Sequence, residues 1–365
     1  MKECRVKDIC IKGSSNLKQK DVEGKKGLYP VYGASGIISS IDTYHQENEY
    51  IAIVKDGSGI GRVSFMPPKS SVIGTMQYIL PKEGYDIRYI GYCLQSLGLN
   101  KYKQGAAIPH IYFRDYGERN IVVSENINEQ RRIVSYLDSS FKLIDEIKNK
   151  ALKSLTEAKA LFQSALAEAM EPKEGWEEKT LGELCSIIGG GTPSKKNSSY
   201  YNGDIPWATV SDMNCDYLQN TICKISDDGV KNSSTQIISK NEVIIATRVG
   251  LGKVCILCQD TAINQDLKGI IPKSDNKLIR KFIFWWFRSK SNYIVSNGVG
   301  ATVKGVKLSF ISNLKISLPT ISTQKQIVSH LDKLSSKVRA IEEKYQKMLE
   351  ECDALKQAML RDVFE

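Results

Sequence analysis

The chain has 365 residues, of which 41% are hydrophobic and 25% charged, and it carries a net charge of +10. This length suits two or three domains, and the composition excludes a largely disordered chain. A basic excess favours an acidic partner, such as nucleic acid, a membrane surface or an acidic protein.

No segment predicts membrane insertion or export. The longest apolar runs, such as Ile51–Val54 and Phe282–Phe287, are far too short to span a bilayer. The first residues contain no apolar signal core. Nine cysteines are scattered without framework spacing, so we expect reduced thiols in a cytoplasmic protein.

Residues 1–128 predict a first globular segment that mixes helices and strands, and residues 129–170 predict a long helix. From Gln130 to Met170 there is no proline or glycine. One line of residues recurs at alternating steps of four and three, which is a heptad pattern. Many of its members are Ala or Ser, and its large apolar members include Ile133, Leu137 and Ile144.

A short linker over residues 171–176 contains proline and glycine, and it leads to a second mixed segment over residues 177–320. Within this segment Val243–Ala246 and Val254–Leu257 predict short strands joined by a glycine-containing turn. Lys277–Ser289 predicts a helix.

Residues 321–365 predict a second long helix, again without proline or glycine from Thr323 to Phe364. Its heptad positions carry mostly large apolar side chains, including Ile327, Leu331, Leu334, Val338, Ile341, Met348 and Leu355. We expect the two helices to pack as an antiparallel coiled coil, large side chains against small, each about 60 Å long at about 1.5 Å per residue. The alternative is a helical arm for dimerisation.

The chain also repeats itself in order, which predicts a tandem duplication with pseudo-twofold symmetry. Because the globular segments mix helices and strands, we expect an α+β fold with two mixed domains and two long helices. The second domain carries an insertion of roughly twenty residues near its start. The matching segments are Gln130–Asp138 with Gln324–Asp332, Glu3–Cys10 with Glu178–Cys185, and Ile53–Val63 with Ile245–Val254.

The positive charge lies in the globular segments and not in the helices. Residues 1–128 hold 17 basic against 13 acidic side chains, and residues 177–320 hold 18 against 12. Two moderately basic domains on nearly neutral helices favour two separate contacts with a phosphate backbone.

Several motifs resemble the specificity subunit of type I restriction-modification enzymes. In the second half these are Trp176–Leu184, Gly189-Gly-Gly-Thr-Pro-Ser194 and Tyr201-Asn-Gly-Asp-Ile-Pro-Trp207, with Leu318-Pro319 before the last helix. The first half resembles a variant of the same domain through Tyr29–Ile37 and Asp56–Arg62, although it lacks the Thr-Pro-Ser and Ile-Pro-Trp elements.

This resemblance implies a subunit without catalysis of its own. Two target-recognition domains would each read one half of a split, asymmetric site in double-stranded DNA, and the helix pair would set the spacer. Two methyltransferase subunits would dock, and motor-nuclease subunits could join. S-adenosylmethionine, ATP and Mg would belong to those partners, so we expect no cofactor on this chain.

Polar and basic side chains in loops are the candidate DNA contacts, because phosphates and base edges are bound by such groups. The glycine-rich turn at 189–191 lacks the Gly-Lys-Ser/Thr ending of a nucleotide-binding loop, but nearby side chains could hold a DNA phosphate. An ordinary solvated turn or surface charge is the alternative at each position. The candidates are Tyr32, Lys55, Arg62, Lys103, His110, Thr192, Ser194, Lys195, Lys196, Thr209, Ser211, Arg248, Lys253 and Lys304.

Metal binding and catalysis find little support. Cys255 and Cys258 form a lone CxxC without a second pair, and the chain has three histidines. We therefore expect no metal. Three alternatives stay open: the recognition subunit of a combined restriction and modification enzyme that cuts outside its site, a protein scaffold, or an unrecognised enzyme.

Overall fold

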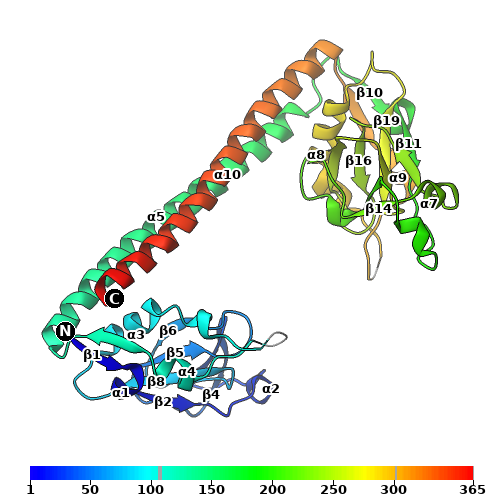
Figure 1. Ribbon diagram of the computed structural model, residues 1–365. Coiled ribbons are helices and arrows are strands. Elements are labelled where there is room, and N and C mark those ends of the chain that lie inside the picture. The colour runs from blue at the N-terminus through cyan, green and yellow to red at the C-terminus, as the bar shows by residue number, and fades with distance from the viewer. Residues whose placement is uncertain (106–108, 301, 365) are drawn as a thin grey trace. The chain divides into compact units, whose positions relative to one another are not determined.

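The computed structural model describes residues 1–105, 109–300 and 302–364. The chain divides into two compact units, Met1–Leu152 with Lys344–Glu365, and Lys153–Glu343. Each unit contains one globular domain together with part of each long helix (Figure 1). We call the globular parts domain 1 and domain 2.

Domain 1 contains two sheets and a closing strand pair. Its larger sheet has the order β2-β8-β5-β6 and its smaller sheet the order β4-β3-β7, while β1 pairs with β9. The strands are β1 (Lys2–Arg5), β2 (Cys10–Ser14), β3 (Tyr29–Gly33), β4 (Gly36–Ile41), β5 (Tyr50–Val54), β6 (Val63–Met66), β7 (Ser71–Val72), β8 (Met76–Pro81) and β9 (Asn120–Val123). The helices are α1 (Val6–Ile9), α2 (Gln19–Val22), α3 (Ile87–Ser96), η1 (Leu99–Tyr102) and α4 (Phe113–Gly117).

Domain 2 has the corresponding parts. Its sheets have the orders β11-β19-β16-β17-β13 and β14-β12-β18-β15, while β10 pairs with β20. The strands are β10 (Glu177–Thr180), β11 (Cys185–Gly189), β12 (Ile205–Ala208), β13 (Tyr217–Leu218), β14 (Cys223–Ile225), β15 (Gln236–Ile238), β16 (Val243–Ala246), β17 (Val254–Leu257), β18 (Thr261–Ile263), β19 (Leu267–Pro272) and β20 (Lys315–Leu318). The helices are α6 (Leu181–Leu184), η2 (Ser198–Tyr201), η3 (Val210–Asp212), α7 (Asp227–Lys231), α8 (Arg280–Ser296) and α9 (Leu308–Ser312).

The topology confirms the α+β fold and the internal repeat. Strands β2, β8, β5 and β6 of domain 1 follow the same order as β11, β19, β16 and β17 of domain 2. In each smaller sheet one parallel pair recurs, β3 with β7 and β12 with β18. The predicted strands Val243–Ala246 and Val254–Leu257 are confirmed as β16 and β17 with the same bounds. The insertion in domain 2 adds β13, α7 and β15 between β12 and β16.

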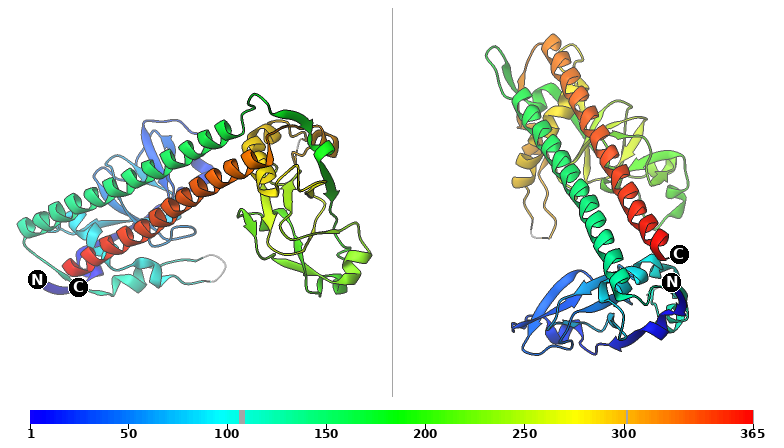
Figure 2. Two further views of the ribbon diagram at one scale, coloured as in Figure 1. Left: turned by 90° about the horizontal axis from the view of Figure 1, so that it is seen from above. Right: turned by 90° about the vertical axis from the view of Figure 1, so that its left-hand side faces the viewer.

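The long helices are α5 (Ile127–Ala169) and α10 (Ile321–Phe364), and Figure 2 shows them side by side. They are antiparallel in both units. In the first unit Lys148 Nζ lies 2.8 Å from Asp353 and Lys356 Nζ 2.6 Å from Asp145. In the second unit Lys159 pairs with Glu342.

The structure corrects the heptad pattern by one residue at alternate positions. Leu137, Ile144 and Leu331 are buried as expected, and Ile133, Ile327, Leu334, Val338 and Met348 are half-buried. Leu355, however, is 51% exposed and Ile341 is 38% exposed. The buried line on α10 passes through Cys352 to Leu360, and between them the half-buried Lys356 holds its Nζ 5.2 Å from the centre of the Phe141 ring.

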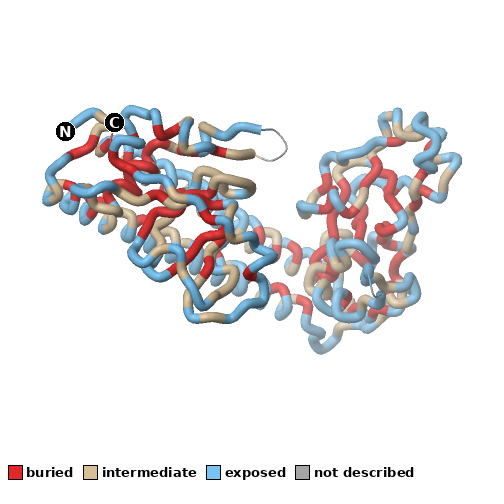
Figure 3. Tube along the Cα trace, turned by 90° about the horizontal axis from the view of Figure 1, so that it is seen from below, coloured by how far each residue is buried: buried red, intermediate tan, exposed pale blue. Residues whose placement is uncertain are grey.

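Burial does not follow the expected division into small residues on α5 and large ones on α10. The buried line of α5 includes Leu155 and Phe162, while α10 buries the small Ser335. Each helix also contributes buried side chains to the core of a domain. Figure 3 marks buried residues along the helices as well as within the domains. Leu137 and Leu360 join the core of domain 1, and Phe162 and Leu331 join that of domain 2.

Candidate nucleic-acid interface

Several loops of domain 2 meet at one end of its larger sheet. The hairpin between β16 and β17 turns there, and Ala246 is the register partner of Leu267, which places the β18–β19 turn beside it. The pairing of Gly189 with Lys268 brings the end of β11 to the same place. We call these segments the loop end of domain 2, residues 189–192, 209–214, 247–253, 264–266, 298–300 and 302–305.

A buried carboxylate organises the middle of this loop end. Asp266 is 9% exposed, and its Oδ1 has no hydrogen-bond partner among the described residues. Arg248 Nη1 lies 3.7 Å from that oxygen. Asp266 Oδ2 accepts hydrogen bonds from Asn264 and Gln265, each at 3.4 Å. The side chain of Thr192 donates to Gln265 Oε1.

A lysine lies beside this carboxylate. Lys268 Nζ donates to the carbonyl oxygens of Gln265 at 2.8 Å and of Leu267 at 3.0 Å. Burial lowers the pKa of Lys268, and the charge of Asp266 partly opposes that shift.

The remaining candidates of domain 2 differ in exposure and in whether their polar groups already form hydrogen bonds. The Thr209 hydroxyl donates to Asp212 Oδ2 at 2.8 Å in a helix cap, so its hydrogen is already used. Lys253 Nζ donates to Asn214 Oδ1 at 3.2 Å. Ser194, Lys195, Lys196, Ser211 and Lys304 are exposed. The loop around Lys304 contains residue 301, which lies outside the described residues.

Domain 1 presents a comparable end. Lys55 follows β5, and Asp56 and His110 form a β-bridge in which the Asp56 carboxylate lies against the His110 imidazole. Burial, and then the charge of Lys55, lowers the pKa of His110. Burial, and then the charge of Lys12, lowers the pKa of Lys55. Arg62 Nη1 donates to the carbonyl oxygen of Ala34 at 2.8 Å, which ties the β5–β6 loop to the β3–β4 turn.

Two further candidates of domain 1 lie in different surroundings. Tyr32 of the smaller sheet packs against a cluster formed by β5, β7 and β8 and is half-buried, whereas Lys103 is exposed. Residues 106–108, in the predicted flexible loop before His110, lie outside the described residues. As DNA contacts, all of these side chains stay predictions.

Sequence reasoning missed why the repeated motif exists. Gln130 and Gln324 are both fully buried at the start of a long helix. Gln130 Oε1 accepts from the backbone N–H of Asp86 at 2.7 Å, and Gln324 Oε1 accepts from that of Ile279 at 2.9 Å. Each amide also donates to two backbone carbonyls. Both therefore fix a long helix to the first turn of the helix in its own domain.

An aspartate eight residues later completes each docking motif. Asp138 accepts from Arg88 at 2.6 Å and from the Tyr92 hydroxyl. Asp332 accepts from Lys281 at 2.7 Å and from Trp285 Nε1 at 3.0 Å. The identical spacing of Gln and Asp in both repeats was the available signal.

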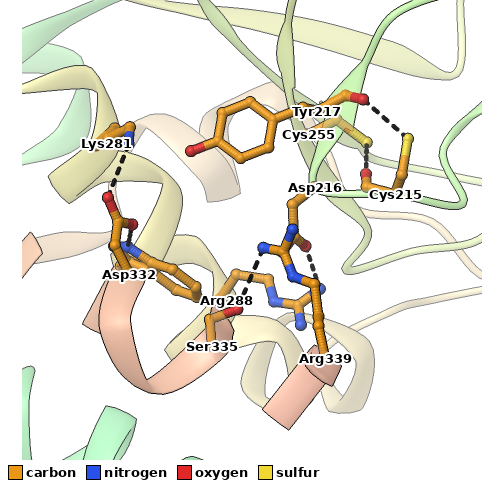
Figure 4. A network of polar contacts seen from close by, with 10 residues as sticks. Cys215, Asp216, Tyr217, Cys255, Lys281, Arg288, Asp332, Ser335 and Arg339 are labelled. Atoms are coloured by element: carbon orange, nitrogen blue, oxygen red, sulfur yellow. Dashed lines mark hydrogen bonds and ion pairs between the residues drawn. The ribbon is translucent and has the colours of Figure 1, made fainter. Parts of the chain in front are cut away.

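A second network joins the insertion of domain 2 to the helices (Figure 4). Asp216, just before β13, is contacted by Arg288 of α8 at 3.4 Å and by Arg339 of α10 at 2.7 Å. Arg339 also donates to Ser335 at 3.2 Å. The inserted strand is thereby held against both helices within the second unit.

The described residues offer no group of three or more His, Cys, Asp or Glu side chains that could hold a metal ion. Cys255 of the CxxC pair is buried, and its Sγ lies 3.0 Å from the carbonyl oxygen of Cys215. Within the described part of the chain, no helix is long and apolar enough to cross a membrane.

Comparison with known families agrees with this duplicated architecture. The family described as type I restriction modification DNA specificity domain matches residues 1–157 and 173–351. The chain belongs to this family. The two matched segments correspond to the two halves of the repeat, each a globular domain followed by its long helix.

Similar family members come from bacteria and archaea. A type I restriction enzyme specificity subunit of Escherichia coli is 28% identical over 271 residues, covering 70% of this chain and 65% of the relative. One from Methanocaldococcus jannaschii is 30% identical over 165 residues, covering 44% and 38%. The aligned part thus spans less than two thirds of these two relatives. Another from the same archaeon is 25% identical over 367 residues, covering 89% and 83%.

Solved structures share the fold. A chain from a study of complex assembly and conformational transition of the type I R-M system has a TM-score of 0.76 at 19% identity, covering 99% of this chain and 96% of its own. The HsdS subunit from Thermoanaerobacter tengcongensis has a TM-score of 0.53 at 17% identity, covering 99% and 95%.

Proposed function

We propose that the chain is the DNA-specificity subunit of a type I restriction-modification system and has no catalysis of its own. Domain 1 and domain 2 each bind one half of a split, asymmetric site in double-stranded DNA. The α5–α10 pair sets the spacer between the halves. The protein works in the cytoplasm, where the host DNA lies.

The observation that carries this proposal is the repeated loop end. In both domains the same hairpin of the larger sheet, β5–β6 and β16–β17, bears exposed arginine: Arg62 in one and Arg248 in the other. Lys55 and Lys253 occupy the same hairpins. Basic side chains on loops suit contacts with phosphates and base edges, and their duplication suits two half-sites.

The same subunit docks two methyltransferase subunits and could also take up motor-nuclease subunits. S-adenosylmethionine, ATP and Mg belong to those partners. This part of the proposal rests on family membership, and the exposed outer faces of α5 and α10 leave room for such contacts.

Binding of the assembled complex to DNA as a function of salt tests the proposal against a protein scaffold. DNA binding through several phosphates should weaken steeply and linearly on a log–log plot, through counterion release. A flat salt dependence would favour the scaffold. Turnover of S-adenosylmethionine or ATP by the isolated chain would contradict the non-catalytic role. A chain that directs cleavage outside its site would favour the combined enzyme.

A further inference from the structure

Gln265 is held in a geometry that leaves half of its amide free. It lies exposed in the turn between β18 and β19. Its Oε1 accepts from Thr192, and its Nε2 donates to Asp266 Oδ2 at 3.4 Å. An amide oxygen accepts two hydrogen bonds and an amide nitrogen donates two, so one acceptor and one donor remain.

Arg248 shares the same carboxylate from the neighbouring hairpin. Its side chain is 58% exposed, and Nη1 lies 3.7 Å from the buried Asp266 Oδ1. A guanidinium has five N–H donors in a planar fork. The ion pair with Asp266 is made through Nη1 without a hydrogen bond, so the N–H donors can face a ligand outside the domain.

We propose that Gln265 reads an adenine and Arg248 reads a guanine in the half-site bound by domain 2, with Thr192 and Asp266 as positioning residues. This inference rests on the proposed function. An amide pairs with N6 and N7 of adenine, and a guanidinium pairs with O6 and N7 of guanine, both in the major groove. Each reading group would form these bonds with the capacity that its internal contacts leave free.

Domain 1 lacks this device at the equivalent turn. The backbone N–H of Lys55 donates to Thr75 O at 3.0 Å, as that of Thr247 donates to Asp266 O at 2.8 Å. Thr75 therefore corresponds to Asp266, and Gly74, which has no side chain, corresponds to Gln265. The two domains must then read different sequences, as an asymmetric site requires.

Methylome sequencing of cells that express the chain with its methyltransferase subunits tests the assignment. Gln265→Ala should relax one adenine position in the domain 2 half-site by roughly five- to 150-fold and leave the other half-site unchanged. Gln265→Glu should shift that position toward cytosine, whose N4 donates to a carboxylate. Arg248→Ala should relax a guanine position, and Thr192→Val should weaken the adenine preference only in part.

The matched control is Gln219→Ala. Gln219 is exposed just after β13, which runs parallel to β17, and so lies at the opposite end of the same sheet. This variant should keep the wild-type motif. Wild-type motifs from both Gln265→Ala and Arg248→Ala would overturn the assignment and leave the proposed function standing. The proposed function itself fails if the wild-type chain directs no motif.

If a variant abolishes methylation altogether, its motif cannot be determined, and the assignment is then tested by DNA binding of the wild-type complex. Each adenine of the domain 2 half-site is replaced in turn by 7-deazaadenine, which lacks the N7 acceptor. Weaker binding at one of these positions would support the role of Gln265. Unchanged binding at all of them would overturn it.

Discussion

Replacing Gln324 by alanine should destabilise the second unit strongly. The side chain is fully buried and makes three hydrogen bonds of 2.9 Å, to the N–H of Ile279 and the carbonyls of Lys277 and Pro319. Each such bond contributes about 0.5–1.5 kcal/mol net, and buried groups left without a partner add to the loss. We expect Gln324→Ala to lower the free energy of unfolding by about 2–4 kcal/mol.

Denaturant unfolding followed by tryptophan fluorescence measures this loss. All four tryptophans, at positions 176, 207, 285 and 286, lie in the second unit, so the signal reports the part of the chain that contains Gln324. Gln326→Ala is the control, because Gln326 is exposed two residues along the same helix and should change stability by less than about 0.5 kcal/mol. A loss below about 1 kcal/mol for Gln324→Ala would refute the role given to the buried amide.

Three further outcomes are expected. Asp216→Ala should lower the free energy of unfolding by about 1–2 kcal/mol in the same assay, because Arg288 and Arg339 lose a carboxylate that is only 14% exposed. The control is Asp204→Ala at an exposed site, and equal stability of the two variants would contradict this prediction. Removing residues 145–151 and 350–356 together shortens each helix by one heptad, which is about 10 Å or roughly three base pairs. The methylated motif should then keep both half-sites and have a shorter spacer, and altered half-sites would contradict the spacer role. Thiol labelling of the native chain should modify the exposed Cys215 and Cys223 first. Burial raises the pKa of Cys10, Cys185 and Cys255 to about 12, so these thiols should react slowly until the chain unfolds. Equal labelling rates of the buried thiols before and after unfolding would contradict this.

The large features of the fold were predictable because they depend on local patterns. The absence of proline and glycine marks both long helices, and the glycine-containing turn marks the β16–β17 hairpin. The heptad phase was less accessible. Ile147, Leu161 and Leu355 are apolar yet exposed, while Leu155 and Phe162 are buried one residue away from heptad positions, so hydrophobicity alone did not identify the buried positions.

The candidate site shows a similar limit. The sequence pointed to Arg248 and Thr192 as polar residues beside glycine turns, but not to Gln265, because its orientation depends on contacts with residues distant in sequence. The hydroxyl hydrogen of Thr209 is used in a helix cap, which the sequence does not show. A sequence shows which groups are polar, whereas the pairing of strands decides which of them retain free hydrogen-bonding capacity.

The central claim is that this chain supplies DNA specificity to a methyltransferase. Methylome sequencing of a host that expresses the partner methyltransferase subunit, with and without this chain, tests it most directly. The account predicts a split, asymmetric motif that is methylated only when the chain is present, with two half-sites and a fixed spacer. A stable complex that adds no new methylated motif would contradict it.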